Sequence, residues 1–302
     1  MSGVLVVAKP AGPTSHDVVA LVRRLAASKR IGHGGTLDPF ASGVLPLFLG
    51  GATRLVEYHL GDPKTYRATI CFGASSTTDD LDGELTPVTG PVLGRGQLEN
   101  ALSGFLGVQL QRPPAYSAVQ VGGRRAYAMA RAGETPTLSP REVTIHALRL
   151  VDWDDADQSR PVAIVEVECS AGTYVRALAR DLGARLGSGA YLCGLVRTAS
   201  GPFSLDDARP LDAIREAAAS GGADAIQAML LPSDTGLDAI PALRLTDAEV
   251  ADATMGRYFR PEAGVGGVPA AGPVRLQDPR GRIVGMGRLD GRRIVPDKML
   301  VS

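Results

Sequence analysis

The chain has 302 residues, 44% of them hydrophobic, and its equal numbers of acidic and basic side chains give a formal net charge of zero. This length suits one large domain with a small one, the apolar runs are too short to span a bilayer, and the charge gives no global attraction to nucleic acid. The first apolar run has no basic segment before it, so we expect a first strand rather than a signal peptide.

The three cysteines, Cys71, Cys169 and Cys193, are odd in number and far apart in sequence. They fit neither a disulfide framework nor a zinc-binding pattern. The four histidines also lack the spacing of metal ligands. We therefore expect a protein of the reducing cytoplasm, without a disulfide framework and without a metal site.

Nearly all basic residues are arginines, and several of them form clusters. Arginine binds phosphates in a bidentate manner and stacks on bases, so a neutral protein with such clusters can still bind RNA. A GC-rich genome explains the overall preference for arginine, and each cluster is equally consistent with a solvated face. The clusters are Arg23-Arg24 with Lys29-Arg30, Arg124-Arg125 with Arg131, and Arg292-Arg293.

The hydrophobic patterns up to about residue 230 predict mixed strands and helices without the alternation of a parallel βαβ fold, which favours an α+β class. In chain order, they predict a strand at 4–7, a helix capped by 14–17 that runs to about Leu25, an apolar segment at 44–49, a strand at 65–72, a helix at 97–105, a strand at 116–121, a short helix at 126–131, strands at 143–151 and 161–169, a helix from Thr173 to Gly187, a strand at 191–198 and a helix at 211–219.

The composition changes after about Leu231, where prolines and glycines separate short apolar segments. Two of these segments, residues 274–276 and 283–289, predict strands. We expect a small β-rich domain of about seventy residues here. The predicted domains are therefore residues 1–232 and 233–302.

The glycine-rich turn around Asp38 carries the strongest hint of chemistry. Glycines in Gly32-His33-Gly34-Gly35 let the backbone approach a ligand closely, and Pro39 stiffens the turn directly after the carboxylate. A lone acid held beside apolar residues is a candidate nucleophile or base. Leu-Asp-Pro-Phe is also an ordinary turn sequence, so both interpretations stay open at this point.

Other polar features have a functional and a structural interpretation. The acidic run Thr78–Gly83 does not fit a calcium loop, because Thr89 stands where the final glutamate is needed, and a solvated turn is expected instead. Arg176 lies in the first helical turn, where the helix dipole disfavours a cation, so it calls for a carboxylate partner. Tyr66 and Tyr174 could stack on a base or move a proton, or simply pack.

Several segments, taken together and in this order, resemble the TruB family of tRNA pseudouridine synthases, which isomerise uridine 55 in the T-loop. The resemblance covers about residues 1–205 and is looser over the C-terminal region. The matching segments are Lys9-Pro10-Ala11-Gly12 with Thr14-Ser15-His16-Asp17, Gly32-His33-Gly34-Gly35-Thr36-Leu37-Asp38-Pro39, Lys64-Thr65-Tyr66-Arg67, Pro113-Pro114-Ala115-Tyr116-Ser117-Ala118 with Gly123-Arg124-Arg125-Ala126-Tyr127, Gly172-Thr173-Tyr174-Val175-Arg176 and Leu195-Val196-Arg197-Thr198.

The resemblance implies a pseudouridine synthase fold of the bacterial, stand-alone type. Its central sheet is mixed and mainly antiparallel, helices flank it, and an insertion at about 112–142 grips RNA. Residues 233–302 would form a PUA-like RNA-binding domain. The implied partner is the T-arm of tRNA, with no cofactor, metal, guide RNA, protein partner or membrane, and we expect a cytoplasmic monomer.

The resemblance also assigns roles to individual residues around a base that is flipped out of the folded T-loop. Asp38 would be the catalytic carboxylate, by attack on C1′ or C6 or by removal of the 2′ proton, with Arg176 as its ion-pair partner and Tyr66 stacked on the base near C5. The other implied substrate contacts are His33 in the space left by the flipped nucleotide, Tyr174 and Leu195 in the pocket, and Lys9, Arg124, Arg125 and Arg131 on phosphates.

Three departures from the family pattern, Ala8, Gly34 and Gln120, affect expected RNA contacts rather than the chemistry. One alternative function is a non-catalytic RNA-binding or tRNA-folding protein, which would need no acid, although folding help could be a second role. Another is a glycosidase that pairs Asp38 with Asp80 or Asp82. A third is a guide-RNA-dependent synthase, which the insertion and the small C-terminal domain fit less well.

Overall fold

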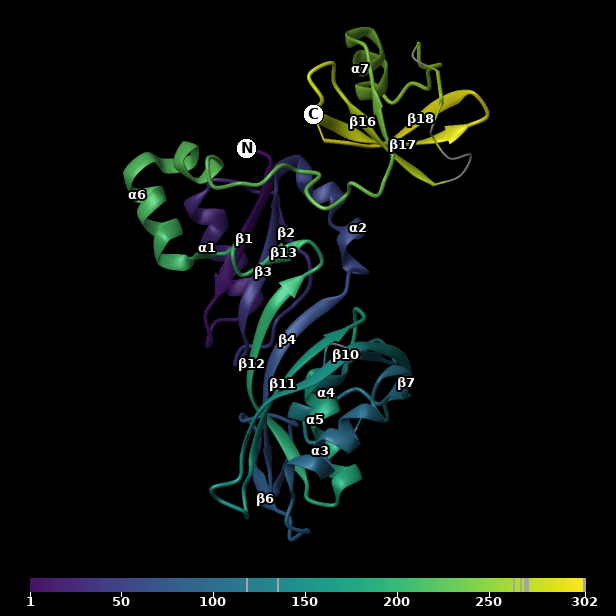
Figure 1. Ribbon diagram of the computed structural model, residues 1–302. Helices are drawn as coiled ribbons and strands as arrows, with labels where there is room; N and C mark the ends of the chain where they lie inside the picture. The colour runs from purple at the N-terminus through teal and green to yellow at the C-terminus, as the bar shows by residue number, and fades with distance from the viewer. Residues whose placement is uncertain (118, 135, 263, 267, 269–271, 301–302) are drawn as a thin grey trace. The chain divides into compact units, whose positions relative to one another are not determined.

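The computed structural model describes residues 1–117, 119–134, 136–262, 264–266, 268 and 272–300, apart from the side chains of Arg125 and Arg131. Its internal contacts divide the chain into two compact units (Figure 1). Unit 1 comprises residues 1–37, 44–60 and 201–302, and unit 2 comprises residues 38–43 and 61–200. Asp38 therefore belongs to the same unit as Tyr66 and Arg176.

Unit 2 is built on a sheet in which each strand is antiparallel to its neighbours. The order is β12 (Ala190–Ser200), β4 (Lys64–Phe72), β11 (Val162–Cys169), β10 (Arg141–Asp154) and β7 (Gly107–Gln111). Ser42 and Gly43 at the start of β3 (Ser42–Leu49) pair with β12 in the parallel direction. Alternate residues of β11 are fully buried, as expected for a strand with one face on a core.

Helices α3 (Arg95–Ser103) and α5 (Val175–Leu186) lie side by side against this sheet (Figure 1). Leu178 and Leu182, one turn apart on α5, are fully buried. The helix ends where Gly187 adopts a left-handed conformation with φ of 68°. Its N-cap is Tyr174 rather than the predicted Thr173, whose hydroxyl instead donates to the Ser170 carbonyl at 2.9 Å.

Unit 2 also contains short hairpins and a short helix. Strands β5 (Ala74–Ser76) and β6 (Leu85–Pro87) form a hairpin around the acidic run. In the predicted insertion, β8 (Gln120–Val121) and β9 (Arg124–Arg125) form a second hairpin that leads into α4 (Ala126–Arg131). Among the described residues of the strand predicted at 116–121, only Gln120 and Val121 are in a strand.

The N-terminal part of unit 1 packs two helices beside its strands. Strand β1 (Gly3–Lys9) lies between β3 and β14 (Arg209–Pro210), and β2 (Ile31–His33) pairs with β3. Helices α1 (Ser15–Leu25) and α6 (Leu211–Gln227) lie side by side next to β1 (Figure 1). The remaining short elements here are η1 (Gly50–Leu55), α2 (Glu57–Leu60) and β13 (Phe203–Ser204).

Two local signals explain the ends of these helices. Thr14 and Asp17 form a reciprocal capping box at the start of α1, in line with the predicted cap. The helix predicted at 211–219 is longer in the structure. Gly222 breaks the helical backbone with φ of 60°, but the chain resumes a helix up to Gln227.

The C-terminal part of unit 1 contains a four-stranded sheet in the order β15 (Ala242–Arg244), β16 (Pro273–Gln277), β17 (Ile283–Asp290) and β18 (Arg293–Met299). Helix α7 (Asp247–Thr254), which the sequence patterns did not predict, packs near β18 (Figure 1). Leu55, Leu237 and Met286 form a small buried cluster that joins this sheet to η1.

The predicted α+β class with a mixed, mainly antiparallel sheet and a β-rich C-terminal region is confirmed. Strand β7 was not predicted, and α3 begins two residues earlier than the pattern at 97–105 suggested. Both segments are partly exposed to solvent, which weakens the apolar pattern from which elements are predicted. The boundary at residue 232 stays a prediction, because the contacts place residues on either side of it in one unit.

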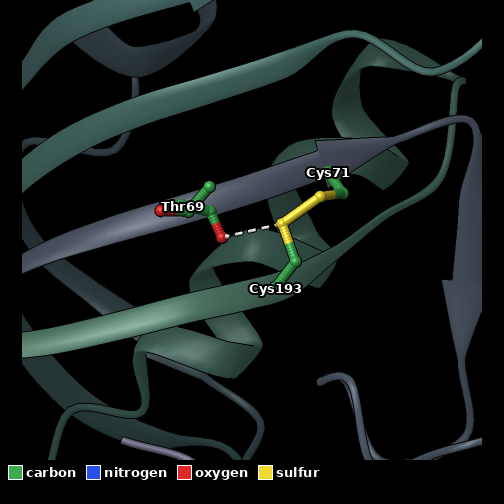
Figure 2. The surroundings of a disulfide bond; sticks show 3 residues. All are labelled: Thr69, Cys71 and Cys193. Atoms are coloured by element: carbon green, nitrogen blue, oxygen red, sulfur yellow. Dashed lines mark hydrogen bonds between the residues drawn. A yellow bond between two sulfur atoms is a disulfide. The ribbon is translucent and has the colours of Figure 1, made fainter. Parts of the chain in front are cut away.

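A disulfide between Cys71 and Cys193 contradicts the expectation that the cysteines form no such bond (Figure 2). The two residues are 122 positions apart in sequence, but they lie on the neighbouring strands β4 and β12 with a Cα–Cα distance of 6.0 Å. A register shift between Leu192 and Gly194 places Cys193 beside Cys71. Linear spacing does not reveal strand neighbours, which is why this pair was missed. Cys169 is the free, buried cysteine.

We predict that this bond contributes to stability, because a cross-link across 122 residues restricts the unfolded chain. On the chain-entropy account the effect is up to about 5 kcal/mol. Reductant should lower the melting temperature of the native protein but not that of Cys71→Ser, and thiol titration of the unreduced, unfolded chain should find one free thiol, that of Cys169. Three titratable thiols and no effect of reductant would contradict the bond.

Candidate active site

Arg176 is the charged centre of unit 2. It is the second residue of α5 and is only 5% exposed, although the positive end of the helix dipole disfavours a cation there. Its NH1 donates to the Thr78 carbonyl and its NH2 to the Tyr116 carbonyl, both at 3.1 Å. The guanidinium is thus held by backbone oxygens from two separate loops.

Two carboxylates balance this buried charge. Arg176 Nε lies 3.0 Å from Asp38 Oδ2, and NH1 lies 3.1 Å from Asp80 Oδ2. The Nε–H is not aligned for a hydrogen bond, so its contact with Asp38 is an ion pair without directional bonding. The Asp38 side chain is 35% exposed whereas that of Asp80 is 5% exposed. Asp38 is therefore accessible to a substrate, while Asp80 holds the arginine in place inside the protein.

The acidic loop that supplies Asp80 is not the solvated turn that the sequence suggested. Asp80 Oδ1 accepts hydrogen bonds from the Asp82 amide at 3.0 Å and from the Thr78 hydroxyl. Burial raises the pKa of the neighbouring Asp79 carboxyl, and the charge of Arg180, 2.9 Å away, opposes that rise. The loop is fixed to β12 by the Leu192 amide, which donates to the Asp79 carbonyl. The sequence predicted that this polar run is exposed, because the arginines that pair with it lie about a hundred positions away in the chain.

Tyr66 lies half-buried on β4 in the same unit. Burial raises the pKa of its phenol, and the charge and hydrogen bond of Arg197 act in the opposite direction. Arg197 is the residue directly opposite Tyr66 on β12 and is only 1% exposed. No role was predicted for Arg197. The signal that could have found it is an arginine inside the apolar strand pattern at 191–198.

Tyr174 and Leu195 were predicted to line a substrate pocket. Leu195 is 8% exposed on β12 and pairs with Ala68 of β4. The backbone of Tyr174 is held on both sides by the amide of Gln111, at 2.8 and 3.1 Å, and the guanidinium of Arg141 lies 4.7 Å from the centre of its ring. The side chains of Tyr174 and Leu195 are therefore both held in fixed positions in unit 2.

His33 and Lys9 belong to unit 1. His33 ends β2, its Nδ1 accepts from the Gly35 amide at 3.3 Å, and its ring contacts that of His16 edge-on. The neighbouring Gly34 has little spare room, since a Cβ there would lie 3.3 Å from a carbon of the Phe48 ring. Lys9 is 1% exposed, and its ammonium donates to the Pro10 carbonyl at 2.9 Å. Its contact with a phosphate stays a prediction.

The arginines expected to bind phosphates lie in the insertion. Arg124 is exposed and forms a bidentate ion pair with Glu134 at 2.7 and 3.0 Å, which raises the pKa of the arginine. Such surface pairs are weak, so a phosphate can replace the carboxylate at little cost. The side chains of Arg125 and Arg131 lie outside the described part of the structure.

The described residues limit two other kinds of site. Among them, no group of three or more histidine, cysteine or acidic side chains is arranged to hold a metal ion. None of the helices in that part of the chain is long and apolar enough to cross a membrane. In the glycosidase alternative, the pairing of Asp38 with Asp80 is disfavoured, because Asp80 is buried against Arg176 and is not offered to a sugar as a second catalytic acid.

We predict that Asp80→Asn destabilises the protein, because it removes one of the two negative charges on a buried arginine while keeping the side-chain shape. Loss of one partner from a buried pair costs about 3–5 kcal/mol at most. Chemical denaturation should show a clear loss of unfolding free energy for Asp80→Asn. The control Asp82→Asn changes an exposed carboxylate on the same loop and should have little effect. Equal stability of the two variants would contradict the role of Asp80.

Comparisons with known proteins agree with this arrangement. The family model described as TruB family pseudouridylate synthase (N terminal domain) matches residues 23–175, and that described as tRNA pseudouridylate synthase B C-terminal domain matches residues 176–238. The proteins named tRNA pseudouridine synthase B from Bradyrhizobium diazoefficiens and Synechococcus sp. strain WH7803 are similar in sequence. The first is 47% identical over 82% of this chain and 72% of its own length, and the second is 45% identical over 96% and 94%.

Solved structures show the same fold at lower identity. The chain resembles a protein in the structure of an H/ACA RNP bound to a substrate RNA containing 2′-deoxyuridine, with a TM-score of 0.72 and 23% identity over 99% of this chain and 85% of that chain. It resembles equally a chain of the archaeal box H/ACA sRNP Nop10-Cbf5 complex, with a TM-score of 0.72, 23% identity and coverage of 99% and 86%. At this identity the likeness concerns the fold alone.

Proposed function

Because the chain belongs to the TruB family of pseudouridylate synthases, we propose that it converts uridine to pseudouridine at position 55 in the T-loop of tRNA. The observation that carries the proposal is the ion pair between Asp38 and Arg176. A partly exposed carboxylate backed by a buried guanidinium is the kind of group that this isomerisation requires. The non-catalytic alternative gives no reason for such a pair, although a second role in tRNA folding is compatible with it.

The reaction breaks the bond between N1 and C1′, turns the uracil and forms a bond between C5 and C1′, after which C5 loses its proton. Atoms are rearranged and none is added. Asp38 acts at the junction of sugar and base, where an anion can attack the substrate or take a proton. Arg176 favours the ionised form of Asp38 through its charge, and Asp80 and the backbone oxygens hold that arginine in place.

The substrate base must leave the stack of the folded T-loop before it can reach Asp38, at a cost of a few kcal/mol. In the proposed complex Tyr66 stacks on the flipped base, Tyr174 and Leu195 line its pocket, and His33 fills the space it leaves. Arg124, Arg125 and Arg131 grip phosphates of the T-arm. The enzyme would work in the cytoplasm as a monomer on free tRNA, without a guide RNA or a protein partner.

The C-terminal sheet offers a further RNA-binding surface, in support of the proposed role of residues 233–302. Phe259 pairs with Ile294, which brings the exposed side chains of Tyr258 and Arg293 together, with the guanidinium 4.7 Å from the ring centre. Tyr258 is 62% exposed, and Arg257 and Arg260 are exposed beside it. Exposed arginines around an aromatic ring suit contacts with phosphates and bases.

We predict that Asp38→Asn abolishes pseudouridine formation and leaves tRNA binding nearly unchanged, since the amide keeps the shape but loses the charge. The assay is incubation of an unmodified tRNA transcript, followed by mapping of pseudouridine and a filter-binding measurement. A transcript with cytidine at position 55 is the matched substrate control and should yield no product in the T-loop. Substantial product from Asp38→Asn would overturn the assignment of the catalytic carboxylate.

We predict that the triple variant Arg257→Ala, Arg260→Ala and Arg293→Ala binds full-length tRNA more weakly, with a shallower dependence on salt, by roughly one unit of slope per lost phosphate contact. Its rate on an isolated T-arm hairpin at saturation should match that of the native enzyme. Arg215→Ala on the exposed side of α6 serves as the control. Unchanged affinity and salt dependence would show that this surface does not meet the tRNA.

A further inference from the structure

Arg197 is a fully buried arginine at the centre of the unit 2 sheet. Its residue is 1% exposed, and it is the largest side chain among those that are fully buried in the described structure. Its backbone lies directly opposite Tyr66 across β12 and β4, and its side chain hydrogen-bonds to the phenol of that tyrosine. Burial lowers the pKa of the guanidinium, and Tyr66 opposes this. A buried cation is costly unless nearby groups use its charge.

The direction of this hydrogen bond is set by chemistry. A guanidinium has only donors, so the phenolic oxygen of Tyr66 must accept from Arg197. A phenol that accepts from a cation is stabilised in its ionised form, and its ring is fixed by the bond. The pairing therefore does two things at once, since it positions the oxygen of Tyr66 and opposes the rise in the pKa of Tyr66 that burial causes, which favours the phenolate.

The other ionisable groups near Tyr66 come from neighbouring elements. Cys169 on β11 is buried, which raises the pKa of its thiol to about 11, so it is neutral at physiological pH. Lys64 on β4 itself donates to the Asp62 carbonyl at 2.6 Å, and burial lowers its pKa. The charge of Asp38 raises the pKa of Tyr66. Among these groups Arg197 is the one that bonds directly to the phenol and favours its anion.

The backbone of Arg197 is held as closely as its side chain. It pairs with Gly43 at the start of β3, and a Cβ at Gly43 would lie 2.2 Å from the Arg197 carbonyl oxygen. Gly43 also has φ of 108°, which a side chain would strain. The glycine therefore lets the segment that follows Asp38 lie against Arg197. Arg197 and Tyr66 thus lie on neighbouring strands, and the segment that follows Asp38 pairs with Arg197.

We propose that Arg197 is a positioning residue for catalysis: it orients Tyr66 and stabilises the phenolate that receives the C5 proton of the rotated uracil. The inference rests on the proposed function and adds to it the group that makes Tyr66 an effective base. An unassisted phenol, with a pKa of about 10, is a poor base at neutral pH. General-base help of this kind contributes typically about 10²–10⁴-fold to a rate.

The step balances without any further reactant. Tyr66 enters it as the phenolate, having released its proton to water. After C5 is bonded to C1′, the C5–H bond breaks and its proton passes to the phenolate oxygen. The electron pair of that bond forms the C5–C6 double bond, the pair of the N1–C6 double bond moves to N1, and N1 takes a proton from water. Neutral Tyr66 and pseudouridine result. The positive charge of Arg197 stays constant throughout.

The test compares Arg197→Met and Arg197→Lys in the full-length enzyme with tRNA that carries either hydrogen or deuterium at C5 of uridine. We expect Arg197→Met to slow single turnover about 100-fold with little change in tRNA affinity, and Arg197→Lys to recover a large part of the rate. Removal of the cation raises the pKa of Tyr66 further, so the Met variant should stay slower than the native enzyme at every pH from 7 to 9. Deuterium should slow the Met variant more than the native enzyme.

Two controls separate this role from a structural one. Arg149→Met removes an exposed arginine from β10 and should leave the rate unchanged. If Arg197→Met does not fold, as judged by circular dichroism and tRNA binding, Arg197→Lys carries the test through its isotope effect. A native-like rate in both variants, or a slow rate with an unaltered isotope effect, overturns the proposal. Absence of product from the native enzyme would instead overturn the proposed function itself.

Discussion

The buried guanidinium of Arg176 is the interaction on which the rest of the site depends. It draws together four segments that are distant in sequence: the start of α5, the turn at Asp38, the acidic loop at Asp80 and the insertion at Tyr116. A charge with 5% exposure is tolerable only when it is surrounded by such partners. The contacts that stabilise this part of unit 2 are therefore the same ones that hold the partly exposed carboxylate of Asp38 in place.

A second buried arginine, on β12, has a similar role toward a residue of the neighbouring strand β4. Arg197 hydrogen-bonds to Tyr66, and Arg176 forms an ion pair with Asp38. Each of the two groups with a proposed chemical role therefore contacts a buried arginine. Both arginines are almost inaccessible to water, which strengthens their effect on the acidic partner in front of them. The disulfide between Cys71 and Cys193 joins the same two strands, β4 and β12, that carry Tyr66 and Arg197.

The sequence predicted more of the fold than of the site's interior. Regular apolar periods predicted most strands of the central sheet and the amphipathic helix α5, because one face of each is buried. The arginine at the start of α5 indicated a carboxylate partner, and the resemblance identified Asp38 as that partner. Asp80 was missed because its burial depends on Arg176, about a hundred residues further on. The cysteine pair was misjudged for the same reason, since strand neighbours arise only on folding.

The central claim is that the pair of Arg176 and Asp38 serves the chemical step rather than the capture of tRNA. The most direct measurement is the single-turnover rate of pseudouridine formation by Arg176→Lys, together with its dissociation constant for tRNA. The substitution keeps the charge but removes the forked geometry that holds Asp38, Asp80 and two carbonyls at once. We expect a large loss of rate with nearly native affinity. A native rate with weakened binding would contradict the account.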